Sequence, residues 1–164
     1  LRKVKVSGGG RCNITHDCFD PKLLSTHYPR GQKELIGPFF KWQPKDMIHW
    51  IEANGVPTKI EKDGRVFPRS NSSQSVIDCL ENIARKKQIE IRKETPVRSF
   101  TRNESNKQWD LELENGNLLN ADCICIASGS IKGSRLVDSI EKLGHSVNLP
   151  IPSLFAFDTP CHNL

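Results

Sequence analysis

Three consecutive glycines near the start of the chain, Gly8 to Gly10, restrict its fold more than any other feature. Because glycine has no Cβ atom, this run allows positive φ angles and lets another molecule approach the backbone closely. Successive backbone N–H groups in such a loop can form a concave site for phosphate oxygens. The planar, permanently charged guanidinium of Arg11 suits a pyrophosphate. The same run is also typical of an ordinary turn, and it contains neither the G-x-G-x-x-G fingerprint nor a Walker loop.

The length of the chain, 164 residues, is enough for one domain with a core but hardly for two. Hydrophobic residues make up 36% and charged residues 26%, which argues against intrinsic disorder. No stretch approaches the roughly 20 apolar residues of a membrane helix, and no signal peptide precedes the glycines, so we expect no membrane partner. Because the chain begins without Met, in what resembles the end of a strand, we predict a single domain, residues 1–164, truncated at both ends.

The cysteines predict reduced thiols rather than disulfides or a metal site. No pair has Cys-x-x-Cys spacing, so neither a zinc ribbon nor a dithiol redox motif is expected. A fourth ligand for a metal near His16 is hard to name. Nothing signals secretion, and reduced thiols are typical of a cytoplasmic protein, the location we predict. The six cysteines are Cys12, Cys18, Cys79, Cys123, Cys125 and Cys161.

The first half of the chain combines irregular segments with two helices. Residues 1–44 are rich in turn formers and aromatic residues, and they predict a short strand, the glycine loop and mostly irregular backbone. A helix is predicted over residues 44–55, since Pro stands at its start and Gly after its end. Asp63-Gly64 predicts a hairpin over residues 59–67. A second helix, capped by serine, is predicted over residues 72–87 from the helical spacing of its apolar residues.

The segment that follows is predicted to be an antiparallel β-meander. Apolar and polar residues alternate over residues 89–92, 97–100 and 109–114, which is typical of half-buried strands. The polar residues 103–107 are expected to form a hairpin tip.

A nearly continuous apolar run over residues 121–127 predicts a strand covered on both faces, as in a parallel sheet. It ends at Ser128-Gly129, where small residues let a ligand approach the carboxyl edge of an α/β sheet, although ordinary strand-to-helix turns share this pattern. A helix is expected from about Gly133 to Leu143, ending at Gly144. The predicted fold class is therefore α/β (mixed α+β), with a parallel-sheet portion and an antiparallel β-meander.

The remaining polar clusters indicate little on their own. Arg65 and Arg69 flank a short strand, a pattern typical of a solvated face. His16 lies next to Asp17, which would suit acid–base chemistry, but loop polarity explains the pair equally. No Ser/His/Asp order and no carboxylate pair stands out, so the catalytic residues stay unassigned. The three tryptophans are expected to pack rather than to stack on bases.

Four stretches taken together resemble the YhiN-like (BaiN-type) family of NAD(P)/FAD-dependent oxidoreductases. The string SGGGRCN-x-T in the first stretch is quite specific, whereas the others are weak alone. Their order and approximate spacing agree with the family over most of the chain. The stretches are Lys5–Thr15, Gly37–Trp42, Gly55–Lys59 running on into Gly64–Ser70, and Ala121–Gly129 with the trailing Leu143-Gly144-His145.

The resemblance implies a partial FAD-binding domain of the two-dinucleotide-binding type. It also implies NAD(P)H as electron donor, a small-molecule substrate, and the remainder of the parent flavoprotein as partner. The implied FAD contacts are the loop residues Ser7, Gly8, Gly9, Gly10, Arg11, Cys12 and Asn13, then Val97 near the adenine, and the turn residues Ala127, Ser128 and Gly129.

Departures from the family pattern affect these expectations. The family's opening β-α-β unit is expected before Leu1, so this piece alone is expected to be inactive and to have lost much of the FAD affinity. Ser128 stands where the family has Thr, and Ser130 where it has Gly, which puts the fit of that turn in doubt. A basic nucleic-acid-binding module and an inactive remnant stay open as alternatives, the former motivated by the charge of +5. Acidic residues interleaved with scattered basic ones argue against nucleic acid.

Overall fold

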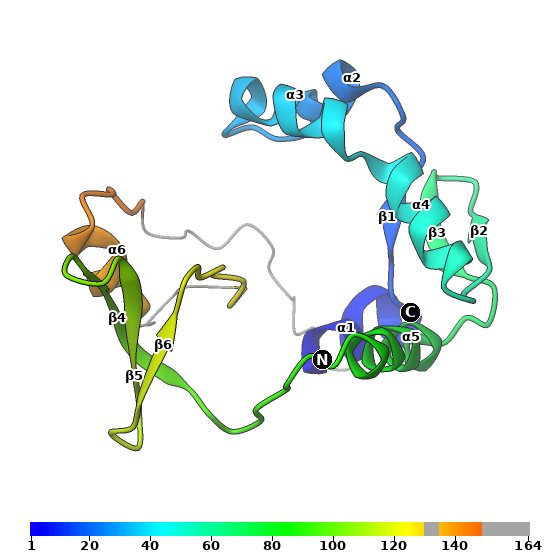
Figure 1. Ribbon diagram of the computed structural model, residues 1–164. Coiled ribbons are helices and arrows are strands. Elements are labelled where there is room, and N and C mark those ends of the chain that lie inside the picture. Colours follow the sequence, from blue (N-terminus) through cyan, green and yellow to red (C-terminus); the bar gives the residue numbers. More distant parts are fainter. Residues whose placement is uncertain (130–134, 149–164) are drawn as a thin grey trace, which may run out of the picture. The chain divides into compact units, whose positions relative to one another are not determined.

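The computed structural model describes residues 1–129 and 135–148. The chain divides into two compact units, Leu1–Ile91 and Arg92–Leu164, and each contains one three-stranded sheet (Figure 1). The prediction that these residues form a single domain stays a prediction. Within the described residues, no helix has the length and apolar character needed to cross a membrane.

The first unit is mostly helical around a small sheet. Its strands have the order β1-β3-β2, and both pairings are antiparallel. Its elements are α1 (Arg2–Val6), a 3₁₀ turn η1 (Ser7–Gly10), β1 (Thr15–His16), α2 (Pro21–Thr26), α3 (Gln32–Lys41), α4 (Pro44–Ala53), β2 (Thr58–Ile60), β3 (Arg65–Pro68) and α5 (Ser73–Lys86).

The core of the first unit lies between α4 and α5. Its buried residues are joined by Val4 of α1, which packs against them from the start of the chain. The short helix α1 contacts α5, and the Ser73 hydroxyl donates a hydrogen bond to the Lys5 carbonyl at 2.9 Å. The beginning of the chain is therefore held on the long helix before the glycine loop starts. The buried cluster consists of Cys12, Ile51, Val56, Val76 and Cys79.

The glycine loop has left-handed backbone at four positions. The φ angles are 57° at Gly8, 66° at Gly9, 83° at Gly10 and 63° at Cys12. The Cys12 N–H donates to the Ser7 carbonyl at 2.9 Å, which closes the loop on itself. Because the Cys12 side chain belongs to the core, the loop is anchored where the chain leaves it.

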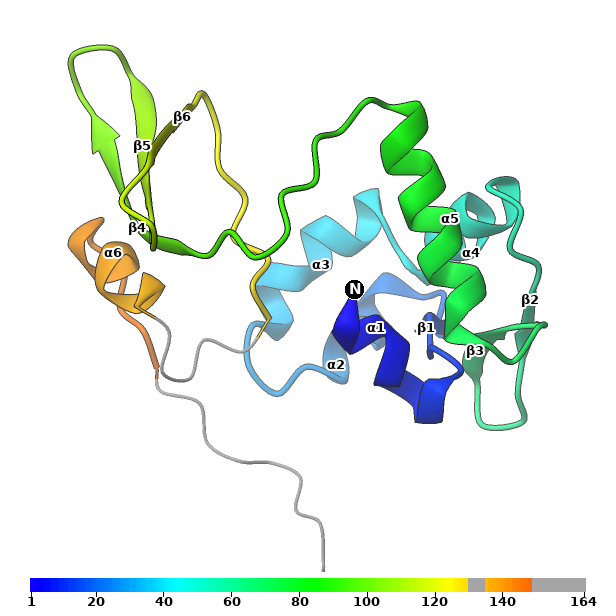
Figure 2. The same cartoon turned by 90° about the horizontal axis from the view of Figure 1, so that it is seen from below.

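The second unit is a meander with one helix. Its strands β4 (Val97–Asn103), β5 (Gln108–Leu113) and β6 (Leu118–Ala121) are antiparallel in this order, and α6 (Leu136–Lys142) contacts β4 (Figure 2). The Phe100 N–H in β4 donates to the Ser139 hydroxyl of α6 at 3.2 Å. Both residues are buried, so this bond joins the helix to the sheet within a dry contact.

Several predicted elements are confirmed where the local residues determine them. The helix expected over residues 44–55 is α4, and the serine-capped helix is α5, where the Ser72 hydroxyl accepts from the Gln74 N–H at 3.2 Å. The hairpin around Gly64 is also present, and so is the strand pair with its tip at residues 103–107. The third strand of the observed meander is β6, not residues 89–92 as predicted. The last predicted helix is α6, and residues 130–134 before it lie outside the described residues.

The opening of the chain is helical where a strand and irregular backbone were predicted, so this prediction is wrong. The apolar alternation in Arg2–Val6 is too short to separate a strand from a helix, and packing of Val4 decides for α1. Asp20 caps α2 by accepting from the Leu23 N–H at 2.7 Å. Helix α3 contains Pro38 in its interior, where proline is unfavourable, and this residue concealed the helix in the sequence.

Two predicted strands are wrong for a different reason. Residues 89–92 form no strand, and Ile89 and Ile91 are both 58% exposed. Residues 122–127 form none either, since β6 ends at Ala121 and the cysteines after it are exposed. A strand that is apolar on both faces needs neighbouring strands and two covering layers, and the described residues supply neither. Both described sheets are antiparallel, so the expected parallel portion is not found in this part of the chain.

The first prediction concerns the link between α4 and β2. Glu52 Oε1 accepts from the Thr58 hydroxyl at 2.6 Å and from the Thr58 N–H at 3.1 Å. The hydroxyl bond above all lowers the pKa of this carboxyl from its ordinary value of 4.5. A lowered pKa stabilises the fold fully above the unfolded value, and this stabilisation is lost as the pH falls through the folded value. We expect the difference in Tm between the protein and Glu52→Gln to shrink from about pH 6 to about pH 3.

Thermal unfolding followed by circular dichroism measures this difference. Glu81→Gln, a change at an exposed glutamate on α5, is the control and should give a Tm difference that does not follow this pH profile. A Tm difference for Glu52→Gln that stays constant with pH would contradict the role of the carboxylate.

The second prediction separates two neighbouring glycines. A Cβ atom on Gly8 would lie 2.8 Å from the Asn13 nitrogen and 2.9 Å from Phe67 Cε1, whereas one on Gly9 would meet nothing within 4 Å. Gly9→Ala should cost about 1–2 kcal/mol for the left-handed backbone. Gly8→Ala should cost about 1–3 kcal/mol more, because the loop must move off the aromatic ring. Urea unfolding measures both losses, and equal values would show that Gly8 has no packing role.

Candidate functional site

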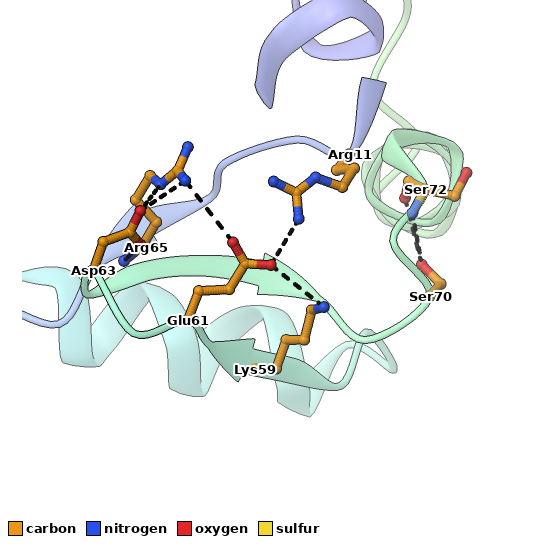
Figure 3. A network of polar contacts seen from close by, with 7 residues as sticks. All are labelled: Arg11, Lys59, Glu61, Asp63, Arg65, Ser70 and Ser72. Atoms are coloured by element: carbon orange, nitrogen blue, oxygen red, sulfur yellow. Dashed lines mark hydrogen bonds and ion pairs between the residues drawn. The ribbon is translucent and has the colours of Figure 1, made fainter. Parts of the chain in front are cut away.

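The side chain of Arg11, in the glycine loop, extends to the β2–β3 hairpin and forms an ion pair with Glu61. Its Nη1 donates to Glu61 Oε1 at 2.6 Å, and Lys59 Nζ lies 3.4 Å from the same oxygen (Figure 3). Arg65 Nη2 lies 4.0 Å from the other carboxylate oxygen. The hydrogen bond from Arg11 is the largest cause that holds the pKa of Glu61 below its ordinary range, and Lys59 adds to it. Three cations thus surround one charged carboxylate.

The ring of Phe67 packs against the guanidinium of Arg11. The guanidinium carbon of Arg11 lies 4.0 Å from the ring centroid, and that of Arg65 lies 5.4 Å from it. Phe67 is fully buried on β3, so its position is fixed by the core. A guanidinium over an aromatic ring is attracted electrostatically by the ring face, which restricts the rotamers of Arg11.

Arg65 is itself held by the turn of the hairpin. Its Nε and Nη2 each lie 2.7 Å from Asp63 Oδ2, and its backbone N–H donates to Oδ1 at 3.2 Å. The hydrogen bond from the Arg65 side chain lowers the pKa of Asp63, and the same bond raises the pKa of Arg65. Both side chains are about half exposed, so the pair orients the turn more than it stabilises it.

The predicted loop residues lie together but have different roles. The Ser7 hydroxyl donates to the Val4 carbonyl at 3.1 Å, in a partly buried position. Cys12 is buried in the core, with 7% of its surface exposed, which leaves its thiol for packing. Gly9 and Asn13 are exposed. The loop therefore presents some of its residues to solvent and uses the others to hold its shape.

The other predicted site residues belong to the second unit. Val97 begins β4 opposite Leu113, next to a shift in register. Ala127, Ser128 and Gly129 are exposed in the irregular segment after β6, with Gly129 at a φ of 78°. Their role in cofactor binding stays a prediction.

A cavity that sequence reasoning missed lies in the first unit beside the end of the glycine loop. Its volume is about 480 Å³. The only signal in the sequence was the aromatic stretch Gly37–Trp42, whose tryptophan was expected to pack rather than to stack on bases. The cavity is lined by Asn13, Ile14, Thr15, His16, Leu24, Tyr28, Phe39, Trp42, Gln43, Pro44 and Met47.

His16 and Asp17, which the sequence placed side by side, form a pair at this site. His16 Nδ1 lies 3.2 Å from Asp17 Oδ1, and its Nε2 lies 3.1 Å from the Asp63 carbonyl oxygen. One ring nitrogen thus faces the neighbouring Asp17 and the other faces the turn of the β2–β3 hairpin. Over the described residues, no three His, Cys, Asp or Glu side chains group closely enough to hold a metal ion.

Comparisons with known proteins place these features in a family. The family model described as HI0933-like protein Rossmann domain matches residues 1–146. Ribosomal RNA dihydrouridine synthase of Escherichia coli (strain K12) is 28% identical over 130 residues, which cover 79% of this chain and 31% of that protein. 3-Dehydro-bile acid delta(4,6)-reductase of Clostridium scindens is 24% identical over 168 positions, which cover 98% of this chain and 39% of that protein.

The chain thus spans about a third of the length of these two relatives. The family match includes the glycine loop, the hairpin and the meander, and it confirms the resemblance that the four sequence stretches indicated. The chain belongs to the HI0933-like protein Rossmann domain family.

Proposed function

We propose that this chain is part of an FAD-dependent oxidoreductase and that its glycine loop binds the phosphates of the cofactor. One observation carries the proposal. The two most basic of the four family stretches fold against each other, with Arg11 of the loop seated on Phe67 and Glu61 of the hairpin. FAD, when bound, supplies the redox chemistry, and the protein supplies binding and orientation.

Part of the loop fits a phosphate-bearing ligand. A Cβ atom on Gly9 would meet nothing within 4 Å, and one on Gly10 would meet only the Lys5 carbonyl at 4.0 Å, so the backbone is open to close approach. Arg11 supplies a planar cation, and about a third of its side chain is exposed. Arginine binds phosphate oxygens through two parallel N–H groups, a geometry that a rigid ring beneath the guanidinium favours.

Other residues of the glycine loop are packed against the protein and are not open to a ligand. Gly8 is enclosed by Phe67 and Asn13, and Cys12 lies in the core. The Cys12 N–H is already bonded to Ser7 at 2.9 Å, whereas the Arg11 N–H makes a longer bond of 3.4 Å to Gly8. We therefore narrow the proposed phosphate contacts within the loop to Gly9, Gly10 and Arg11.

The names of the relatives support an oxidoreductase, since one is called a reductase and the other a dihydrouridine synthase. We extend this to NAD(P)H as electron donor and to a small-molecule substrate. The remainder of the parent flavoprotein is the proposed partner, because the apolar segment after β6 exposes Cys123, Cys125 and Ile126. A cytoplasmic location stays a prediction from the cysteine pattern.

The third prediction tests the phosphate contact. ADP carries the pyrophosphate of FAD without its flavin ring, and Arg11→Gln should weaken ADP binding roughly tenfold or more, since a charged hydrogen bond is lost. Arg102→Gln is the matched control, because Arg102 also lies over an aromatic ring, 5.3 Å from the centroid of Trp109. Isothermal titration of both variants, followed by an FAD titration read from flavin absorbance, measures the effect. Absence of ADP and FAD binding, or equal losses in the two variants, would overturn the proposal.

The fourth prediction concerns Glu61, which occupies the guanidinium of Arg11 at 2.6 Å and competes with any phosphate there. Glu61→Gln should strengthen ADP binding by roughly threefold or more, and the gain should shrink at high salt as the charges are screened. Glu112→Gln, which removes the carboxylate 3.2 Å from Arg98, is the control and should leave ADP affinity unchanged. Weaker binding in Glu61→Gln would show that Glu61 positions Arg11 for the ligand instead of competing with it.

A further inference from the structure

Arg65 at the start of β3 shares the aromatic support of Arg11. The guanidinium carbons of the two arginines lie 5.4 Å and 4.0 Å from the centroid of the same ring, that of Phe67. Both distances are within the roughly 6 Å at which a ring face attracts a cation. Phe67 is fully buried, so its ring is a fixed support for both side chains. The fold therefore brings a guanidinium group of the hairpin next to that of the glycine loop.

Asp63 orients Arg65 without using all of its donors. Nε and Nη2 of Arg65 both lie 2.7 Å from Asp63 Oδ2. In the part of the chain that the structure describes, Nη1 of Arg65 contacts no acceptor. A guanidinium is planar and its five N–H donors have a fixed geometry, so a carboxylate on one edge fixes the direction of the remaining donors. An arginine that is held in this way is prepared for a second anion.

Glu61 lies between the two arginines but is too short to bind both (Figure 3). Its Oε1 accepts from Arg11 at 2.6 Å, whereas its Oε2 is 4.0 Å from Arg65 Nη2. The second distance is beyond the range of a hydrogen bond. An anion with oxygens on two phosphorus atoms is longer than a carboxylate. Such an anion suits the spacing of the two guanidinium groups better than Glu61 does.

The charges of the cluster also favour a diphosphate. Three cations and two carboxylates lie together here, so one positive charge is left over. Lys59 lies 3.4 Å from the oxygen of Glu61 that Arg11 contacts, so the carboxylate keeps a cation when a ligand takes Arg11. Hydrogen bonds between arginine and phosphate are charge-assisted and are stronger than neutral ones.

We infer that Arg65 is a second phosphate-binding residue, and that Arg11 and Arg65 each hold one phosphate of a diphosphate. The inference rests on the proposed function, because Arg11 is the loop residue proposed to contact the cofactor. It adds the hairpin to that site and specifies the ligand class, a diphosphate in place of a single phosphate. Asp63 is a positioning residue, since it acts on the ligand only through Arg65.

The fifth prediction uses inorganic pyrophosphate and inorganic phosphate as probes, with binding measured by phosphorus NMR titration. The protein should bind pyrophosphate roughly tenfold more tightly than phosphate, since only pyrophosphate reaches both arginines. Arg65→Gln should remove most of this preference and change the affinity for phosphate by less than about twofold. Lys62→Gln is the matched control, because it removes an exposed positive charge from the same turn, and it should keep the preference.

Arg65→Lys keeps the positive charge and tests the geometry of the guanidinium. It should still lower the preference for pyrophosphate roughly threefold, because an ammonium lacks the planar fork that contacts Asp63 with one edge and a phosphate with the other. Circular dichroism shows whether each variant is folded.

Two outcomes overturn the inference. One is equal affinity for the two probes. The other is an equal loss in Arg65→Gln and Lys62→Gln, which would indicate general attraction between charges. Arg11→Gln in the same titrations reports on the proposed function separately. If Arg11→Gln weakens both probes and Arg65→Gln weakens neither, the inference fails and the proposed loop contact stands. If only Arg65→Gln weakens pyrophosphate binding, the proposed loop contact fails and an anion site on the hairpin remains.

Discussion

The buried ring of Phe67 is the contact that the glycine loop and the β2–β3 hairpin share. Its ring lies against Gly8, whose missing Cβ leaves the space, and beneath the guanidinium of Arg11. The strand that carries it, β3, pairs with β1 on one side and with β2 on the other. One aromatic side chain therefore joins the glycine loop to a hairpin about 50 residues later in the chain. Loss of the ring would remove the packing contact that both motifs share.

The positive charges around the glycine loop are balanced in part by the carboxylate of Glu61. The carboxylate of Glu61 lies close to Arg11, Lys59 and Arg65. Its negative charge offsets the repulsion among these three cations. A phosphate group that takes the place of Glu61 on Arg11 exchanges one anion for another. Glu61 stays in the cluster, so a bound phosphate adds negative charge, and the carboxylate released from Arg11 still has Lys59 within 3.4 Å. The three cations around Glu61 offset part of this added charge.

The sequence predicted those elements whose signals are local. Pro44 and Gly55 bracket α4, and Asp63-Gly64 forms the hairpin turn, since caps and turns depend on a few adjacent residues. Residues 122–127 could not be predicted correctly in this way, because a buried strand depends on neighbours that the local pattern does not reveal. The charges around Phe67 suggested a solvated face, whereas the ring between them is buried. Trp42 was expected to pack and is half exposed in the cavity, which only the arrangement of three helices reveals.

The two ends of the glycine loop are tied to different elements. Before it, the Lys5 carbonyl accepts from Ser73 on α5 at 2.9 Å, and after it, the Ile14 N–H donates to Val66 on β3 at 2.8 Å. The residues between Lys5 and Ile14 therefore form a short loop that is anchored at both ends. Most of the chain entropy of such a loop is already lost when the protein folds. A ligand that docks on this loop meets a preorganised surface, and the ordering penalty that weakens binding by flexible glycine segments is largely absent.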